Sequence, residues 1–189
     1  AGHLMTARQL SRFRQALAML PPAPASLAAS AGVLLGRDYH FDMVRPGIGL
    51  YGANPSIGGE NPFQTVAVLE ARVLQLRRID SGDSVGYAAT FHAKRPTMLA
   101  TVALGYADGI MRSTAMTGAA AIGGRRVPYA GRISMDLATL DVTGLDVAVG
   151  DPVEMIGDTI RLDAVAAAAG TNAYEVLTGL GARLPRHYS

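Results

Sequence analysis

The chain has 189 residues, of which 49% are hydrophobic and 17% charged, and its formal net charge is +2. This composition is typical of a folded globular protein and excludes a disordered chain, because enough apolar side chain is present to fill a core. The sequence contains no cysteine, which excludes disulfides, thiolate metal sites and a cysteine nucleophile.

Positive charge is spread thinly, and lysine is almost absent. Lysine and arginine number 17 against 15 aspartates and glutamates, whereas nucleic-acid binders usually gather basic residues on one face. Lys94 is the only lysine. Because basic residues are this sparse, we expect no nucleic acid as a partner. No run of about 18 apolar residues exists, so we expect no membrane as a partner either. The histidines lack zinc-ligand spacing, and no metal site is expected; they are His3, His40, His92 and His187.

The first 54 residues predict the end of an α/β unit. They begin Ala-Gly-His-Leu, without an initiator methionine or the pattern of a signal peptide, as though cut from a longer protein. Residues 6–20 predict a helix with a Thr6–Gln9 capping box, which Pro21 and Pro22 end. A small-residue stretch and a short apolar strand ending in RPGIGLYG follow. This alternation is typical of an α/β barrel or a doubly wound sheet.

The rest of the chain predicts a β domain. Residues 55–62 have the composition of a linker. Strands are expected near 64–78, 84–91, 97–104, 119–122, 126–131, 136–142 and 152–156, and their regular spacing favours a sandwich or barrel. Helices are expected at 162–169 and 173–180, and the final RLPRHY is expected to return as an edge strand.

Several short segments combine polar residues with glycine at the ends of predicted strands, where loops often carry function. The segment from Arg45 to Ile48 offers backbone N–H groups to an anion, or is a tight turn. Tyr87 stands among small residues and either packs against a neighbour or presents its phenol to a cleft. The loops at 105–109 and 131–136, taken singly, are each explained better as scaffold than as a functional site.

Taken together, these segments resemble the motifs of a known protein family. The series RPGIGLYG, VGYAATF, ALGYADG, VPYAGRISMD, NAYEVLT and RLPR, preceded by SLAASAGVLLG, resembles the C-terminal part of the alanine racemase family over nearly the whole chain. The resemblance implies a mainly β fold. It places the last part of a (β/α)8 TIM barrel in residues 1–54, a linker in 55–62, and a barrel-like or sandwich-like C-terminal β domain in 63–189.

The same resemblance implies a function. Family members are pyridoxal-5′-phosphate enzymes of the cytoplasm that interconvert L- and D-alanine, which supplies D-alanine for peptidoglycan. They act as homodimers in which each active site uses the barrel of one subunit and the β domain of the other. We therefore expect alanine as substrate, and a second copy or a complementing N-terminal barrel half as partner.

Individual residues follow from the matched motifs. Tyr87 corresponds to the catalytic base that takes the α-proton of L-alanine, and Arg45 to the arginine facing the cofactor's pyridine nitrogen. The phosphate site corresponds to Ser30, the amides of Gly47 and Ile48, and Tyr174. The backbone amide of Met135 corresponds to a contact with the substrate carboxylate. The substrate entrance corresponds to Tyr106, Arg112, Arg132 and Asp136.

Two positions depart from the family pattern. The family's cofactor lysine lies near the start of the barrel, whereas Lys94 stands in the HAKRP stretch between two predicted strands, where a solvated loop lysine is expected. Ala29 replaces an asparagine before the phosphate-site serine. We expect this chain alone to be inactive and to hold no covalent cofactor. The alternatives are a non-catalytic dimerisation or interaction module, and a racemase of another small amino acid.

Overall fold

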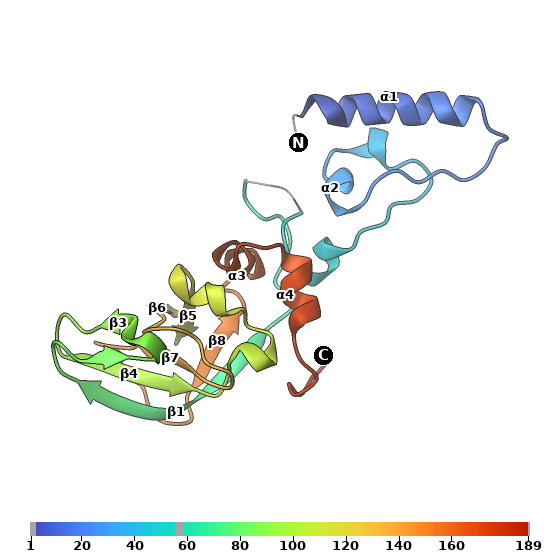
Figure 1. Ribbon diagram of the computed structural model, residues 1–189. Helices are drawn as coiled ribbons and strands as arrows, with labels where there is room; N and C mark the ends of the chain where they lie inside the picture. Colours follow the sequence, from blue (N-terminus) through green and yellow to red (C-terminus); the bar gives the residue numbers. More distant parts are fainter. Residues whose placement is uncertain (1–2, 56–58, 189) are drawn as a thin grey trace. The chain divides into compact units, whose positions relative to one another are not determined.

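The computed structural model describes residues 3–55 and 59–188 and divides into two compact units, Ala1–Gln64 and Thr65–Ser189. Figure 1 shows a first unit of helices and loops and a second unit built around a sheet. The second unit holds nearly all the large buried apolar side chains, so the main core of the protein lies there.

The first unit begins with a long helix, α1, which spans Leu4–Ala18. Its N-cap is His3, whose Nδ1 accepts a hydrogen bond from the Met5 N–H at 3.1 Å. The prediction of a start at residue 6 with a Thr6–Gln9 capping box is therefore wrong, because the imidazole caps the helix earlier. No residue of α1 is buried.

The remainder of the first unit forms short helical turns. These are α2 (Ser30–Val33), η1 (Arg37–Tyr39) and η2 (Ile48–Tyr51). The predicted apolar strand before residue 52 is wrong: among the described residues of this unit, only Ala29 and Arg45 form a bridge, which is parallel. A strand with one bridge leaves most of its backbone groups unpaired, and the chain satisfies them in a tight 3₁₀ turn instead.

The second unit is an antiparallel sheet that nearly closes on itself. Its six strands run in the order β6-β5-β8-β1-β4-β7, and a bridge between Tyr129 and Leu140 links the two ends of this order. The strands are β1 (Leu69–Ile79), β4 (Thr97–Val102), β5 (Ala119–Ile122), β6 (Arg125–Pro128), β7 (Ala138–Asp141) and β8 (Pro152–Ile156). The prediction of a mainly β, barrel-like domain is confirmed.

Strand β1 is the centre of this sheet. Its first half pairs with β8 and its second half with β4, with an irregularity between Val73 and Gln75. Leu69, Ala71 and Val73 are buried at every second position, which is the alternation expected of a strand with one face on a core. The strand begins at Leu69 rather than at residue 64.

The segment predicted as a strand at 84–91 is mostly a turn. It forms two-residue strands, β2 (Ser84–Val85) and β3 (Phe91–His92), on either side of the 3₁₀ turn η3 (Tyr87–Ala89). Gly86, Ala88 and Ala89 have φ angles of 77°, 61° and 48°. A left-handed backbone does not fit a strand, so this segment forms a turn instead.

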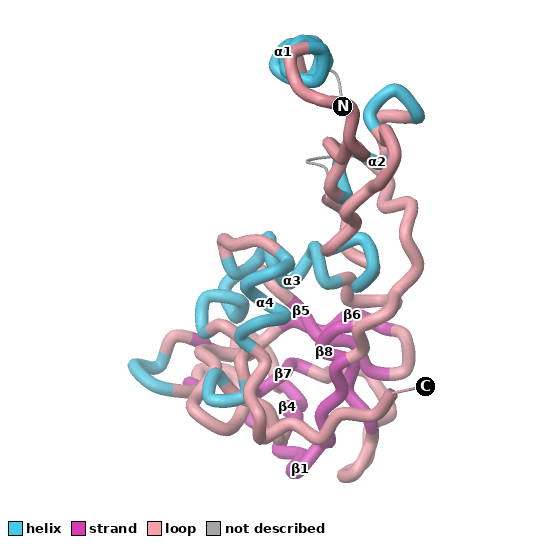
Figure 2. The backbone as a smooth tube through the Cα atoms, turned by 90° about the vertical axis from the view of Figure 1, so that its right-hand side faces the viewer, coloured by secondary structure: helices cyan, strands magenta, loops and turns pink. Residues whose placement is uncertain are grey.

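Two helices and two further 3₁₀ turns complete the unit. They are η4 (Tyr106–Asp108), η5 (Arg112–Met116), α3 (Leu162–Ala169) and α4 (Ala173–Gly179). Helix α3 ends at Gly170, which is left-handed, and α4 begins at Asn172, whose side chain accepts the Glu175 N–H. Figure 2 shows α3 and α4 together at one end of the sheet. The edge strand predicted for 183–188 is absent from the described part of the chain.

Candidate active site

Tyr87 stands on a strained and exposed turn. Its side chain belongs to η3, and 71% of the residue is exposed. The Ala89 N–H donates to the Gly86 carbonyl at 3.1 Å, which closes the turn. A Cβ at Gly131 would lie 3.1 Å from the Val85 oxygen, so the neighbouring loop approaches closely only because residue 131 is glycine. The phenol is thus held away from the core by its own backbone.

A cavity brings Tyr87 together with two other residues of the predicted site. It has a volume of about 490 Å³ and is lined by Tyr87, Tyr106, Arg112, Ile133 and Ser134. Two phenols and a guanidinium offer hydrogen-bond donors and one permanent positive charge, which suits a small ligand with a carboxylate.

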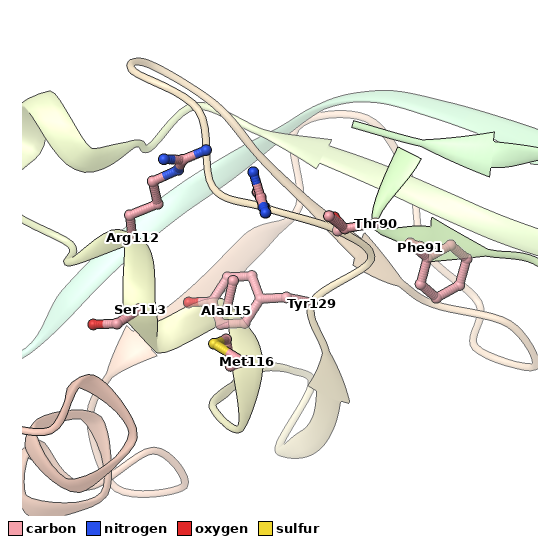
Figure 3. Close-up of a pocket in the computed structure, with 9 residues that line it drawn as sticks. Thr90, Phe91, Arg112, Ser113, Ala115, Met116 and Tyr129 are labelled. Atoms are coloured by element: carbon pink, nitrogen blue, oxygen red, sulfur yellow. The ribbon is translucent and has the colours of Figure 1, made fainter. Parts of the chain in front are cut away.

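A second cavity shares Arg112 with the first. Its volume is about 580 Å³, and Arg132 also lines it. Figure 3 shows the Tyr129 ring between Arg112 and Phe91 in this pocket. Burial raises the pKa of Tyr129 well above its ordinary value, so this phenol remains protonated and neutral at physiological pH. No carboxylate is among the residues that line either cavity.

The loops that carry Tyr106 and Met135 are bonded to one another. The Tyr106 N–H donates to the Ser134 carbonyl at 3.0 Å, and the Ala107 N–H to the Met135 carbonyl at 2.9 Å. A Cβ at Gly105 would lie 2.3 Å from the Met135 oxygen, so glycine is required for this approach. Both Tyr106 and Met135 are partly exposed, at 43% and 54%.

Asp136, another residue of the predicted entrance, is paired with a residue that the sequence analysis did not single out. Arg183 Nη2 lies 2.7 Å from Asp136 Oδ1 and 2.9 Å from Asp108 Oδ1. The hydrogen bond to Asp136 is the largest single cause that raises the pKa of Arg183, followed by the hydrogen bond to Asp108 and its charge. The RLPR motif contains this arginine, but nothing in its spacing points to two acidic residues in distant loops.

Tyr174 lies apart from both cavities. It occupies the first turn of α4, is half exposed, and lines neither cavity. Arg132 and Met135 likewise do not line the cavity of Tyr87.

In the first unit, Ser30 is the centre of a small cradle of backbone donors. The buried Ser30 Oγ accepts the Gly47 N–H at 2.8 Å and the Gly49 N–H at 3.3 Å. Ile48 begins the 3₁₀ turn η2 in the same loop. Both amides donate to the hydroxyl, so Ser30 ties the loop of Gly47 and Gly49 to its own segment.

Arg45 is hydrogen-bonded to the segment that precedes Ser30. Its backbone N–H donates to the Ala28 carbonyl at 2.8 Å, and its guanidinium bonds to Ser26 Oγ and to the Leu27 carbonyl. The guanidinium therefore lies over the same small-residue segment that leads to Ser30.

Comparison with known proteins identifies the family. The alanine racemase C-terminal domain matches residues 66–188, and the alanine racemase N-terminal domain matches residues 1–55. The chain belongs to the alanine racemase family. The alanine racemase of Methylobacterium nodulans is 48% identical over 99% of the chain and 51% of its own length. The catabolic alanine racemase of Agrobacterium fabrum is 46% identical over 98% of the chain and 49% of its own length. The chain spans about half the length of these curated relatives.

Solved alanine racemases have the same fold. The structure of the Bartonella henselae enzyme with covalently bound pyridoxal phosphate superposes with a TM-score of 0.92 at 43% identity, over 100% of this chain and 53% of the other. The biosynthetic alanine racemase of Pseudomonas aeruginosa superposes with a TM-score of 0.93 at 42% identity, again over 100% and 53%.

Lys94 is the only lysine in the sequence of this alanine racemase family member. It is exposed in the turn after β3 and lines a third pocket with Arg95 and Asp141, among others. No group of three or more metal-ligating acids, histidines or cysteines occurs in residues 3–55 and 59–188. No helix in that part of the chain is both long and apolar enough to cross a membrane.

Proposed function

We propose that the chain is part of a pyridoxal-5′-phosphate-dependent alanine racemase that interconverts L- and D-alanine. The observation that carries the proposal is the cavity lined by Tyr87, Tyr106 and Arg112. It gathers the proposed base and two proposed entrance residues, although these lie on three separate turns of the β unit. Family membership supports this reaction, and the cavity supports its assignment to the surroundings of Tyr87.

Tyr87 is the proposed acid–base residue. Its phenol is exposed on a rigid turn, so it is available to a substrate held by another part of the enzyme. Arg112 provides a fixed positive charge in the same cavity, which favours an anionic substrate group there. The amide of Met135 is the proposed contact with the substrate carboxylate, and Tyr106, Arg112, Arg132 and Asp136 form the proposed entrance.

The residues of the first unit fit the cofactor's phosphate group. Ser30 and the Gly47 and Ile48 amides are the proposed holders, together with Tyr174 of the second unit, and Arg45 is the proposed partner of the pyridine nitrogen. The Ser30 hydroxyl accepts the Gly47 N–H, which brings the proposed serine and the proposed loop together and supports this assignment. When bound, pyridoxal phosphate supplies the electron withdrawal that makes the α-proton of an amino acid removable. A guanidinium has N–H donors and no acceptor, so Arg45 offers only donors to that nitrogen.

The chain alone is proposed to lack activity, because the described first unit contains no lysine to attach the cofactor. A homodimer, or a complementing N-terminal barrel half, is the proposed partner. The proposed limits remain 1–54 for the barrel remnant, 55–62 for the linker and 63–189 for the β domain. A cytoplasmic location and a supply of D-alanine to peptidoglycan belong to the same proposal.

The substrate is proposed to be a small neutral amino acid. No carboxylate lines either cavity around Arg112, so neither offers an ion pair to a long cationic side chain. This favours alanine, with another small amino acid as the alternative.

Complementation tests the proposal. The chain is assayed for alanine racemisation with added pyridoxal phosphate, alone and together with a separately produced N-terminal half of an alanine racemase. Activity is expected only in the mixture, and Tyr87→Phe should abolish it. Tyr188→Phe is the matched control, because Tyr188 is 92% exposed near the end of the chain. Activity of the chain alone that is lost in Tyr87→Phe would overturn the proposed dependence on a partner, and binding of the two halves without activity would favour the interaction module.

A further inference from the structure

Three segments of the second unit converge behind the cavity of Tyr87. We call residues 105–109 the Tyr106 loop and residues 134–137 the Met135 loop; the third segment, 179–183, comprises the last residue of α4 and the four residues after it. The two loops share backbone hydrogen bonds of 2.9 and 3.0 Å. The third segment joins the Tyr106 loop through the Gly181 N–H, which donates to the Asp108 carbonyl at 2.9 Å.

The approach of these segments leaves no room for side chains at two glycines. A Cβ at Gly109 would lie 2.2 Å from the Gly179 oxygen, and a Cβ at Gly105 would lie 2.3 Å from the Met135 oxygen. Real Cβ atoms do not make such short contacts with backbone. Glycine at these two positions therefore lets the three segments approach closely, and their relative placement is defined within narrow limits.

One guanidinium spans all three segments. Arg183 Nε donates to Asp108 Oδ1 at 3.1 Å, and Arg183 Nη2 donates to Asp136 Oδ1 at 2.7 Å. The Asp108 side chain is only 8% exposed, whereas that of Asp136 is 55% exposed. The other oxygen of Asp108 accepts the Gly105 N–H at 2.9 Å. A nearly buried carboxylate thus depends on Arg183 for its only cationic partner among the described ion pairs.

We propose that Arg183 is a positioning residue of the active site, whose guanidinium fixes the Tyr106 loop against the Met135 loop by bridging Asp108 and Asp136. The bridge acts on the side chain of Tyr106 and on the backbone of Met135 without reaching into the cavity itself, because Arg183 lines neither pocket. The planar fork of arginine suits this role, since a single lysine ammonium cannot direct two separated donors in fixed geometry. The bridge between the two loops is argued from the structure alone, and only its expected effect on substrate binding rests on the proposed function.

Amide hydrogen exchange on the full 189-residue chain tests the bridge directly. In Arg183→Met, the amides of Tyr106 and Ala107 are expected to exchange about tenfold faster or more, because a lost charge-assisted hydrogen bond lowers the cost of local opening. Arg183→Lys should show a smaller acceleration. The Ala130 amide, which donates to the Thr139 carbonyl in the sheet, is the internal reference for global unfolding.

Arg186→Met is the matched control. Arg186 lies in the same terminal segment and bonds only to the Leu180 carbonyl among the described contacts, without an acidic partner. It should leave the Tyr106 and Ala107 amides unchanged. If Arg183→Met does not fold, Asp136→Asn removes the exposed end of the bridge and should still accelerate both amides. Unchanged exchange of these amides relative to Ala130 in the folded variant would overturn the proposal.

The complemented enzyme gives a second readout. Arg183→Met should raise the KM for alanine about tenfold with a smaller change in kcat, because the Met135 amide would lose its fixed position for the substrate carboxylate. Arg183→Lys should restore part of the loss, and Arg186→Met should behave as the unaltered chain does. Absence of racemisation in the unaltered mixture would refute the proposed function and leave the exchange result to decide the role of Arg183. An active mixture in which Arg183→Met has an unaltered KM would overturn the positioning role.

Discussion

The two units of the chain differ in how they bury apolar side chains. In the first, the buried hydrophobic residues among those described are Ala25, Ala28, Ile48 and Ala53, and α1 buries none. In the second, the sheet encloses large side chains such as Leu140, Val153, Met155 and Ile156. Burial of large apolar side chains is the main favourable term in folding. The β unit therefore has the means to be stable by itself, whereas the first unit has very little core of its own.

The same contrast applies to function. The β unit has a cavity with the proposed base and part of the proposed entrance, held by hydrogen bonds and by the Arg183 bridge. The first unit offers the Ser30 cradle but no lysine. A β unit with the proposed acid–base residue and a small unit with part of the proposed cofactor site are what the proposed shared active site requires.

The largest effect should come from shortening the same side chain in each unit. Leu140→Ala is expected to lower the free energy of unfolding by about 2–5 kcal/mol, because the leucine is fully buried and its loss leaves a cavity. Leu17→Ala in α1, where the leucine is half-buried, should cost less than about 1 kcal/mol. Urea unfolding of the two variants measures both values. Equal losses would contradict the difference between the units.

A smaller effect is expected within the β unit, where an added methyl group should destabilise the Tyr106 loop more than the end of helix α4. Gly105→Ala is expected to cost about 1–3 kcal/mol, because its Cβ would overlap the Met135 carbonyl. Gly179→Ala is the control, since a Cβ there would meet only the Gly109 oxygen at an ordinary 3.8 Å. Thermal unfolding compares the two. Similar midpoints for both variants would show that the Tyr106 and Met135 loops adapt easily, and the loops would then not be part of the rigid scaffold.

The smallest expected effect is a loss of stability of the β unit at alkaline pH. Burial raises the pKa of Tyr129 from its ordinary value of 10.0. Above pH 10 the unfolded chain loses this proton while the folded chain keeps it, so the stability present below pH 10 is lost as the pH rises. The slope from this one group is at most about 1.4 kcal/mol per pH unit.

Urea unfolding at about pH 9 and about pH 11 measures this slope. Tyr129→Phe should remove the contribution, and Tyr188→Phe, at an exposed position, should leave it in place. An unchanged slope in Tyr129→Phe would show that the phenol ionises equally well in the folded and unfolded chain.

Sequence patterns predicted several short elements of the β unit at their exact limits, although they began the alternating strand β1 five residues too early. The strands at 119–122 and 152–156 have the limits that the sequence indicated, and so does the helix Leu162–Ala169. The turn at Tyr87 was missed because Ala88 and Ala89 are left-handed, and alanine gives no signal for that conformation. The last residues were expected to form a strand, but Arg183 instead binds carboxylates in two loops that are distant in sequence.

The candidate site depended on motifs more than on periodicity. Tyr87, Tyr106 and Arg112 were assigned by resemblance, and the structure brings them to one cavity. No pattern of spacing relates these three residues, because each lies on a separate 3₁₀ turn. Arg183 was not assigned a role, since its partners become apparent only when the chain is folded.

The most direct test of the central claim is exchange of the α-proton of L-alanine in D₂O, followed by NMR. The chain is mixed with pyridoxal phosphate and the N-terminal half of an alanine racemase, and Tyr87→Phe is compared with Tyr188→Phe. The account predicts deuterium incorporation in the mixture, none with the chain alone, and its loss only in Tyr87→Phe. Equal incorporation with Tyr87→Phe would contradict the assignment of Tyr87 as the residue that moves the proton.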